Sequence, residues 1–428
     1  MITSPVFRGK RYAVLGLARS GVATIDALRA SGAEVVAWDS NEATRAALSG
    51  VTLADPLEID LAGFDAVVVS PGIPLNRHPI ADRARAAGVP VIGDIELFAQ
   101  ARGALPAHRV VGITGTNGKS TTTALIDHIC RTAGLPSLAG GNIGIPILAQ
   151  DALGAGGVYV LELSSYQIDL TATLDCDVAL LLNITPDHLD RYDGFAGYAA
   201  SKARLFAMQS PGHRAVIGIT DPASAAIAAE IRAGRADDVI ALPARGDVDQ
   251  SDWPALQGPH NAQNALAAIA ACEALGIDRP AIDRGLASFP GLPHRMERVA
   301  TRDGVLFVND SKATNPESAA PALAAYPRIH WILGGKAKTD DLDACRPGFG
   351  HVVRAYTIGD AGTMFAELLS GEMPVEVAGT LDAAVRSAAA HARPGDTVLL
   401  SPACASFDQF RDYEARGQAF RDAVEALA

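Results

Sequence analysis

Seven consecutive residues in the second quarter of the chain combine glycines, hydroxyl groups and one lysine. They read Gly115, Thr116, Asn117, Gly118, Lys119, Ser120 and Thr121. A β-branched apolar run precedes them at 110–114, and a helical apolar pattern follows at 124–129. In such a loop, backbone N–H groups hold phosphate oxygens, Lys119 adds positive charge and the Ser120 hydroxyl can bind Mg²⁺. The stretch predicts a nucleoside triphosphate site, with a glycine-rich turn and an exposed lysine as the alternative.

Polar residues also follow two later apolar runs. Glu162 ends the run 158–161, where a carboxylate is well placed to bind Mg²⁺ beside a triphosphate. Capping of the next helix by Glu162 or Ser164 is the alternative interpretation. His188 lies in a polar segment after the run 177–182 and could serve a ligand, although a lone histidine is more often structural. Lys202 lies on an amphipathic helix at 199–206, where the residues alone predict a solvated charge.

The N-terminal segment predicts a β-α-β unit. Strands at 12–15 and 34–38 flank a helix at 22–30, and Asp39 follows the second strand. A third strand at 66–69 precedes Ser70, Pro71 and Gly72, at the sheet edge where open α/β sheets bind ligands. A plain turn explains that tripeptide equally well.

The C-terminal third predicts another open, largely parallel sheet. Strands are expected at 305–308, 329–333, 355–358 and 397–400. Polar clusters follow these strands, as they do at the edge of an active site in α/β proteins. A linker is expected at 101–107, before the phosphate loop. The chain therefore predicts an α/β protein of three successive units.

Composition restricts the classes of partner. The 428 residues carry a net charge of −12, which argues against general nucleic-acid binding. The five cysteines are scattered and odd in number, so neither a disulfide framework nor a zinc site is expected. No run of about 18 apolar residues is present, and the first ten residues do not resemble a secretion signal. We expect a cytoplasmic protein that binds small molecules, without nucleic acid or membrane, and nothing requires more than a monomer.

Seven motifs together resemble the Mur ligase family, most closely its glutamate-adding branch. They are the stretches 115–121, 141–144 (Gly-Asn-Ile-Gly), 162–167 (Glu-Leu-Ser-Ser-Tyr-Gln), 187–190 (Asp-His-Leu-Asp), 291–295 (Gly-Leu-Pro-His-Arg), 310–315 (Asp-Ser-Lys-Ala-Thr-Asn) and 401–406 (Ser-Pro-Ala-Cys-Ala-Ser). The resemblance covers nearly the whole chain. It departs from the family pattern at Ala18, Pro316 and Tyr413.

The resemblance implies three domains. A Rossmann-like domain at 1–103 would bind the UDP-sugar, a central P-loop ATPase-like domain at 104–291 would bind ATP, and a Rossmann-like domain at 292–428 would bind the amino acid. The implied activity is ATP-dependent addition of D-glutamate to UDP-N-acetylmuramoyl-L-alanine in peptidoglycan precursor synthesis, through an acyl phosphate.

The resemblance also implies roles for individual residues. ATP would contact the phosphate loop together with Asn264, Arg295 and Asp310. The UDP-sugar would be bound by Arg19, Ser20, Asp39, Ser70, Gly72 and Asn142. Glutamate would lie near Lys312, Thr314, Lys338, Ser406, Phe407 and Tyr413. Two Mg²⁺ ions are implied, held by Ser120, Glu162, His188 and Lys202, with Lys202 converted by CO₂ to a carbamate. The catalytic set would then be Lys119, Glu162, His188 and Lys202.

Other functions remain open at this point. A ligase of the same family could add a different amino acid, such as the L-isomer of glutamate. A P-loop switch or motor protein would use the same phosphate loop, but it leaves the polar strand ends of the third unit without a purpose. A nicotinamide oxidoreductase is the weakest alternative, because Ala18 interrupts the glycine pattern and Lys119 would not be needed.

Overall fold

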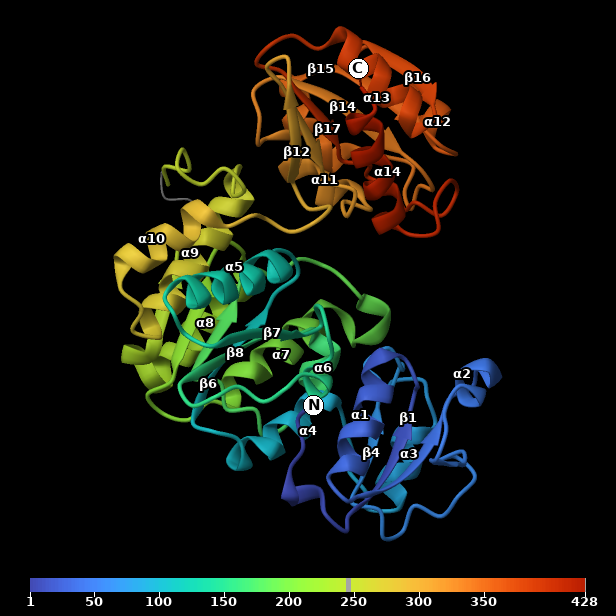
Figure 1. Ribbon diagram of the computed structural model, residues 1–428, viewed down its shortest axis with the longest axis vertical. Helices are drawn as coiled ribbons and strands as arrows, with labels where there is room; N and C mark the ends of the chain where they lie inside the picture. The colour runs from blue at the N-terminus through green and yellow to red at the C-terminus, as the bar shows by residue number, and fades with distance from the viewer. Residues whose placement is uncertain (244–247, 428) are drawn as a thin grey trace. The chain divides into compact units, whose positions relative to one another are not determined.

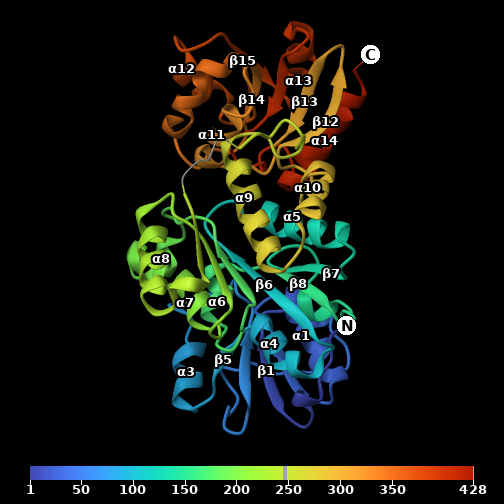
Figure 2. The ribbon, with the colours of Figure 1, turned by 90° about the vertical axis from the view of Figure 1, so that its left-hand side faces the viewer.

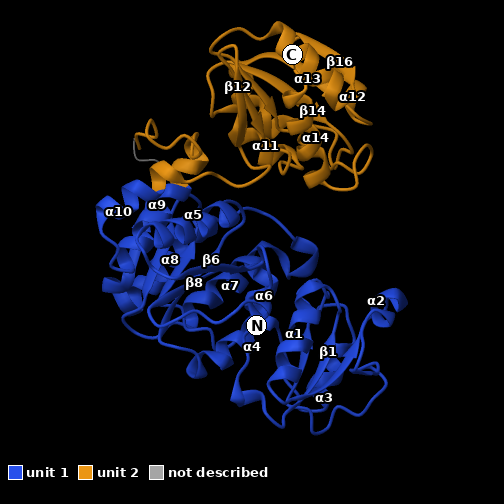
Figure 3. Cartoon of the chain, in the orientation of Figure 1, with its two compact units in different colours: residues 1–246, 264–285 blue, residues 247–263, 286–428 orange. Residues whose placement is uncertain are grey.

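The computed structural model describes residues 1–243 and 248–427. These residues form three β-sheets with helices between the strands (Figure 1), so the expected α/β class is confirmed. They divide into two compact units, residues 1–246 with 264–285 and residues 247–263 with 286–428 (Figure 3). Within the described residues, we find no helix with the length and apolar character needed to cross a membrane.

The first sheet is parallel and has the strand order β3-β2-β1-β4-β5. Its strands are β1 (Arg11–Leu15), β2 (Glu34–Trp38), β3 (Thr52–Leu53), β4 (Ala66–Val69) and β5 (Val91–Ile92). Its helices are α1 (Arg19–Ala30), α2 (Glu42–Ala46), α3 (Ile80–Ala86) and α4 (Asp94–Ala101). Strand β4 is buried along its whole length, as expected for the centre of a parallel sheet. The order of the strands reverses between β1 and β4, and the loops after these two strands therefore face the crevice that binds ligands in such sheets.

The second sheet is also parallel, with the order β11-β10-β9-β6-β8-β7. Its strands are β6 (His108–Thr114), β7 (Ser137–Gly141), β8 (Gly157–Glu162), β9 (Val178–Leu181), β10 (Arg214–Gly218) and β11 (Val239–Leu242). Its helices are α5 (Lys119–Thr132), α6 (Ser165–Asp169), α7 (Gly194–Ala207) and α8 (Pro222–Arg235), while α9 (Pro259–Ala274) and α10 (Arg279–Ser288) begin in one unit and end in the other. Gly140 and Gly141, a residue type more typical of loops, end strand β7 and pair with β8.

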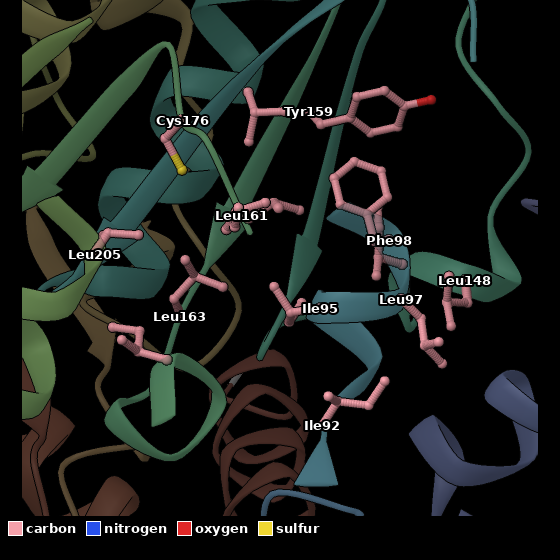
Figure 4. Packing of buried hydrophobic residues seen from close by; sticks show 14 of the residues in the cluster. Ile92, Ile95, Leu97, Phe98, Leu148, Tyr159, Leu161, Leu163, Cys176 and Leu205 are labelled. Atoms are coloured by element: carbon pink, nitrogen blue, oxygen red, sulfur yellow. The ribbon is translucent and has the colours of Figure 1, made fainter. Parts of the chain in front are cut away.

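Helix α4 joins the first sheet to the second within the same unit. Its Phe98 packs edge-on against Tyr159 of β8, with the ring centroids 5.0 Å apart (Figure 4). On the same helix, the Glu96 carboxylate accepts hydrogen bonds from the backbone of Ala172 and Thr173 at 2.7 and 2.9 Å. Phe98 and Tyr159 belong to one continuous apolar core that includes residues of both sheets.

The third sheet has the order β12-β13-β17-β14-β15-β16, and its edge strand β12 runs antiparallel to β13. Its strands are β12 (Glu297–Arg302), β13 (Val305–Asn309), β14 (Ile329–Gly334), β15 (Val352–Ile358), β16 (Val375–Gly379) and β17 (Thr397–Leu400). Its helices are α11 (Pro316–Leu323), α12 (Gly362–Leu369), α13 (Leu381–His391) and α14 (Tyr413–Glu425) (Figure 2).

Neighbouring apolar side chains of β14 point to opposite faces of the sheet, which explains why helices cover both faces. Trp331 belongs to the core that includes Phe365 of α12, whereas its neighbour Ile332 belongs to the core that includes Phe420 of α14. Successive side chains of a strand point to opposite faces, so an uninterrupted apolar strand requires cover on both.

Candidate active site

The phosphate loop connects the central strand β6 to helix α5. Gly118 immediately precedes the helix with φ of +87°, and a Cβ built there would lie 2.2 Å from the Asn264 side-chain oxygen. Asn264 is buried, and its Oδ1 also accepts a 3.3 Å hydrogen bond from the Thr122 hydroxyl in the first turn of α5. The family resemblance implies that Asn264 and the phosphate loop both contact ATP, and the two lie against each other.

The segment after β9 supports the other side of the loop. Thr116 N donates to Asn183 O at 2.9 Å, and Asn117 N donates to the Asn183 side chain at 2.9 Å. The Thr116 hydroxyl lies 3.2 Å from the Tyr198 hydroxyl and donates to Thr185 O at 3.1 Å. These bonds hold the backbone of the loop in one conformation, which is what a phosphate cradle needs.

Two lysines converge on one carbonyl of this loop. Lys119 Nζ donates to Gly115 O at 2.9 Å and to Thr116 O at 2.8 Å. Lys202 Nζ, from α7, also donates to Gly115 O at 2.9 Å and lies 4.6 Å from the centre of the Tyr198 ring. The side chains of two lysines therefore meet at a single peptide carbonyl.

Lys202 is not a solvated charge, and the interpretation from its residue type alone was wrong. Its side chain is only 1% exposed, because it occupies the apolar stripe of α7 together with Tyr198, Ser201, Leu205 and Phe206. Burial, and then repulsion from Lys119, lower the pKa of Lys202 to about 7, against the opposing effect of Asp187 and Asp169. A lysine with this pKa is substantially neutral near pH 7 and is therefore a nucleophile.

Glu162 ends β8 directly beside the phosphate-loop strand. It pairs in register with Ile113, and Thr114 at the end of β6 donates its hydroxyl to Leu163 O at 2.9 Å. The Glu162 carboxylate is buried; Oε1 accepts from Asn142 Nδ2 at 3.0 Å, whereas Oε2 is buried without a hydrogen-bond partner among the described residues. A buried carboxylate oxygen without a partner is costly unless a cation or a donor meets it. Ser164, not Glu162, caps helix α6.

No group of three or more His, Cys, Asp and Glu side chains that could hold a metal ion forms among the described residues. Glu162 and the buried Ser120 would therefore hold an ion only together with oxygen atoms from a bound substrate. Ser120 lies in the first turn of α5, which follows the phosphate loop at the end of β6, and β6 pairs with the strand that ends in Glu162. Oxygen donors of this kind are those that Mg²⁺ prefers.

His188 lies further along the same edge and is exposed. Its φ is +52°, its Nε2 lies 3.4 Å from an Asp187 oxygen, and its ring centroid is 5.1 Å from that of Tyr166. A left-handed backbone in a non-glycine residue is a mark of functional loops. Asp190 O, two residues on, accepts hydrogen bonds from Asn76 and Arg77 of the first sheet's segment.

A pocket of about 200 Å³ collects three of the predicted sugar-nucleotide residues. Arg19 and Ser20, at the N-terminus of α1, line it together with Asn142. An α-helix N-terminus favours anions because its first N–H groups lack partners. The same Asn142 donates a hydrogen bond to Glu162, which links the lining of the pocket to the strand beside the phosphate loop.

The other sugar-nucleotide candidates shape the loops around this pocket. Ser70 donates its hydroxyl to Gly16 O at 3.0 Å and thereby ties the ends of β4 and β1 together. Asp39, after β2, accepts from Leu17 N at 2.7 Å, in the loop after β1 that also contains Gly16. Gly72 O accepts from Arg191 at 3.2 Å.

The C-terminal candidates gather at the polar edge of the third sheet. Lys312 Nζ lies 3.9 Å from the centre of the Tyr413 ring, and Tyr413 begins α14. Ser406 is buried, while Phe407 beside it is 69% exposed. The remaining two, Thr314 and Lys338, are half-buried and exposed respectively on the loops after β13 and β14.

Asp310 and Arg295 belong to the second unit, whereas the phosphate loop belongs to the first. The Asp310 carboxylate is buried and accepts from the Ser401 hydroxyl at 2.8 Å and from Met296 N at 3.2 Å. Burial raises the pKa of Asp310 to about 7, despite these hydrogen bonds and the nearby Arg295 and Arg416. Arg295 is half-buried.

Asp94 and Arg416 lie outside the motifs that the sequence presents. Asp94 begins α4 and lines the same pocket as Arg19, Ser20 and Asn142, with its Oδ1 buried and without a partner among the described residues; burial raises its pKa to about 6. Arg416 is a buried cation beneath the polar edge of the third sheet. A charged residue within an apolar stripe was the available signal for Arg416, which lies one turn before the buried Phe420 on α14.

The strand, phosphate loop and helix, with a lysine folded back on the loop, define an α/β protein of the P-loop type. Residues 113–272 match the Mur ligase middle domain, and residues 294–404 match the Mur ligase, glutamate ligase domain. The chain belongs to the Mur ligase family.

Its relatives include proteins similar over the full length. A UDP-N-acetylmuramoylalanine--D-glutamate ligase of Novosphingobium aromaticivorans is 65% identical over 100% of this chain and 97% of its own. A protein of the same name from Sphingopyxis alaskensis is 63% identical over 100% of both chains. Among solved structures, the D-alanyl-D-alanyl-adding ligase of Acinetobacter baumannii is 16% identical with a TM-score of 0.61, covering 97% of this chain and 93% of its own. At 16% identity, the likeness shows a shared fold alone.

Proposed function

We propose that this protein is an ATP-dependent ligase that adds D-glutamate to UDP-N-acetylmuramoyl-L-alanine, forming an amide bond. The full-length relatives of that name support the choice of substrates. One observation carries the reaction type: Lys119 and Lys202 converge on Gly115 O in the phosphate loop, beside the strand that ends in Glu162. Phosphoryl transfer to a carboxylate brings two anions together, and Lys119 on this loop supplies positive charge where they meet.

The reaction has two steps. First, the alanyl carboxylate attacks the γ-phosphorus of ATP; the bond to the bridging oxygen breaks, giving ADP and an acyl phosphate. The amine of D-glutamate then attacks the acyl carbon, loses a proton and displaces inorganic phosphate. Lys119, released from its loop carbonyls, moves its charge onto the transferring phosphate, while the Thr116 and Asn117 contacts keep the loop in place.

The residues fit a magnesium site. The unpartnered Oε2 of Glu162 and the Ser120 hydroxyl would hold one ion, and His188 with Lys202 as a carbamate would hold a second. Mg²⁺, when bound, neutralises charge on the triphosphate and on the attacking carboxylate. Asn142 orients Glu162 through its 3.0 Å hydrogen bond.

The surroundings of Lys202 support carbamate formation. Burial beside Lys119 disfavours a second ammonium, which leaves a neutral amine for CO₂. The product carries a negative charge, so its interaction with Lys119 becomes attractive.

The three expected domains divide the substrates among them. Residues 1–103 bind the sugar nucleotide through the pocket at Arg19, Ser20 and Asn142, residues 104–291 bind ATP, and residues 292–428 bind glutamate at Lys312 and its neighbours. We place the enzyme in the cytoplasm as a monomer, where it takes small-molecule substrates only.

The test measures phosphate release from ATP and UDP-N-acetylmuramoyl-L-alanine with D-glutamate, L-glutamate or no amino acid. Product mass is recorded in each case. Release together with a gain of one glutamate residue only with D-glutamate supports the proposal. Turnover with L-glutamate alone would change the substrate, and turnover with neither, across Mg²⁺ and bicarbonate concentrations, would refute the ligase assignment.

A further inference from the structure

Arg416 is one of the largest fully buried side chains in the described structure. It lies in the first turn of α14 and is 1% exposed. Burial lowers its pKa to about 10, which still leaves the guanidinium charged at neutral pH. A buried cation is retained at low cost only when its donors are all well used.

Four hydrogen bonds of this guanidinium end on oxygen atoms of two loops. Nε donates to Ser311 Oγ at 3.0 Å, and Nη2 donates to Ser311 O at 2.8 Å, in the loop after β13. Nη2 also donates to Cys404 O at 3.0 Å, and Nη1 donates to Ala405 O at 3.3 Å, in the loop after β17. The planar fork of arginine can span these acceptors, whereas a lysine ammonium cannot.

A third loop, the one after β14, packs against the same group. A Cβ built on Gly335 would lie 3.1 Å from Arg416 Nη1, and Gly335 has φ of +127°. The next residue, Lys336, donates its N–H at 2.9 Å to the Ala405 carbonyl that also accepts from Arg416. Ser311 Oγ in turn donates to Tyr413 O at 2.9 Å and so fixes the start of α14.

These loops carry the residues expected to bind glutamate. Lys312 and Thr314 follow Ser311, Lys338 follows Lys336, and Ser406 and Phe407 follow Ala405. A single guanidinium therefore determines the spacing of three segments that would contact one small molecule. Displacing a reacting group by about 1 Å can cost on the order of 10²-fold in rate.

We propose that Arg416 is the positioning residue for the amino-acid acceptor: it holds the three loops so that the amine of glutamate meets the acyl phosphate. The inference rests on the ligase function proposed above. Arg416 does not contact the amino acid, because its side chain is buried and four of its five N–H donors bond to the loops. It acts on the second step and leaves the first, phosphoryl transfer, unchanged.

The test compares two acceptors of the acyl group in wild type, Arg416→Lys and Ser311→Ala. One acceptor is D-glutamate. The other is hydroxylamine, a small amine that reacts with acyl phosphates and needs no amino-acid site. Arg346→Met is the control, since Arg346 is an exposed arginine of the same unit bonded to Asp343 and Glu372 at 2.9 and 2.8 Å. Thermal unfolding is recorded for every variant.

We expect Arg416→Lys to lower kcat/KM for D-glutamate on the order of 10²-fold. Hydroxamate formation and the KM values for ATP and sugar nucleotide should remain within about threefold. Ser311→Ala removes one acceptor of the guanidinium and the link to Tyr413. It should lower kcat/KM for D-glutamate roughly fivefold to tenfold and leave hydroxamate formation unchanged. Arg346→Met should behave as wild type.

Equal losses with both acceptors would overturn the inference, because a purely structural role would impair both steps. Unchanged kinetics with D-glutamate would overturn it too. If Arg416→Lys fails to fold, Ser311→Ala decides between the same two outcomes. A wild-type protein that uses neither acceptor would instead refute the proposed function, so the two failures are distinguishable.

Discussion

Replacing Gly118 by alanine tests how closely the phosphate loop depends on its backbone. Gly118 has φ of +87°, and its added Cβ would come within 2.2 Å of Asn264 Oδ1 and 3.2 Å of a Leu182 methyl carbon. Gly134, beyond the other end of α5, offers a matched control: its φ is +80°, and no atom lies within 4 Å of an added Cβ. Both substitutions carry the left-handed backbone cost of about 1–2 kcal/mol, but only Gly118→Ala displaces Asn264 from the loop.

The two variants should therefore differ in binding rather than in stability alone. A cost of 1 kcal/mol lowers the melting temperature of a protein this large by roughly 2–4 °C, so both should unfold a few degrees early. Isothermal titration with a non-hydrolysable ATP analogue and Mg²⁺ should show Kd raised by a factor of about ten or more for Gly118→Ala. The Kd of Gly134→Ala should equal that of wild type. Equal affinity in the two variants would refute the reasoning.

Three further predictions concern the charged groups of the site. Lys119→Ala should lower kcat by on the order of 10²–10³-fold at unchanged melting temperature, and normal turnover would exclude its role. Glu162→Gln keeps the shape but removes the charge, so the Mg²⁺ concentration for half-maximal activity should rise by about tenfold or more, whereas an unchanged magnesium titration would count against a ligand at this position. Bicarbonate removal should inactivate wild type reversibly. With a pKa of about 7 for Lys202, the neutral amine grows from roughly 9% at pH 6 to 91% at pH 8, so reactivation at equal concentrations of dissolved CO₂ should accelerate about tenfold. An ordinary lysine would show a hundredfold change.

The phosphate loop could be predicted from the sequence because its signals are local. A β-branched strand, glycines that allow positive φ, and a helix start follow one another within 20 residues, and the structure places them as β6, the loop and α5. Strands β4, β9 and β17 were equally clear, since each is a short apolar run buried along its whole length.

Elements defined by distant partners were not predicted. Strand β12 is half polar and exists because β13 pairs with it, so its sequence gives no strong apolar pattern. The glycines of β7 are typical of a turn, but β8 supplies the partners that make them a strand. Pairing with a distant strand decides whether such segments form strands, and a local sequence pattern carries no information about that partner.

Lys202 shows the same limit at the level of one residue. Its type predicts a solvated charge, whereas its position in the stripe formed by Tyr198, Ser201 and Leu205 places it in the interior. Both Lys202 and Arg416 could have been predicted as buried if their positions in the apolar stripes of their helices had counted for more than their residue types. The orphaned oxygen of Glu162, by contrast, depends on side-chain geometry that no sequence pattern contains.

The central claim is that the substrate carboxylate attacks the γ-phosphorus of ATP. It is tested most directly with UDP-N-acetylmuramoyl-L-alanine labelled with ¹⁸O in the alanyl carboxylate. One labelled oxygen should appear in each inorganic phosphate released during D-glutamate addition, and the amide should retain the other. Phosphate without label, or label recovered in AMP, would contradict the account.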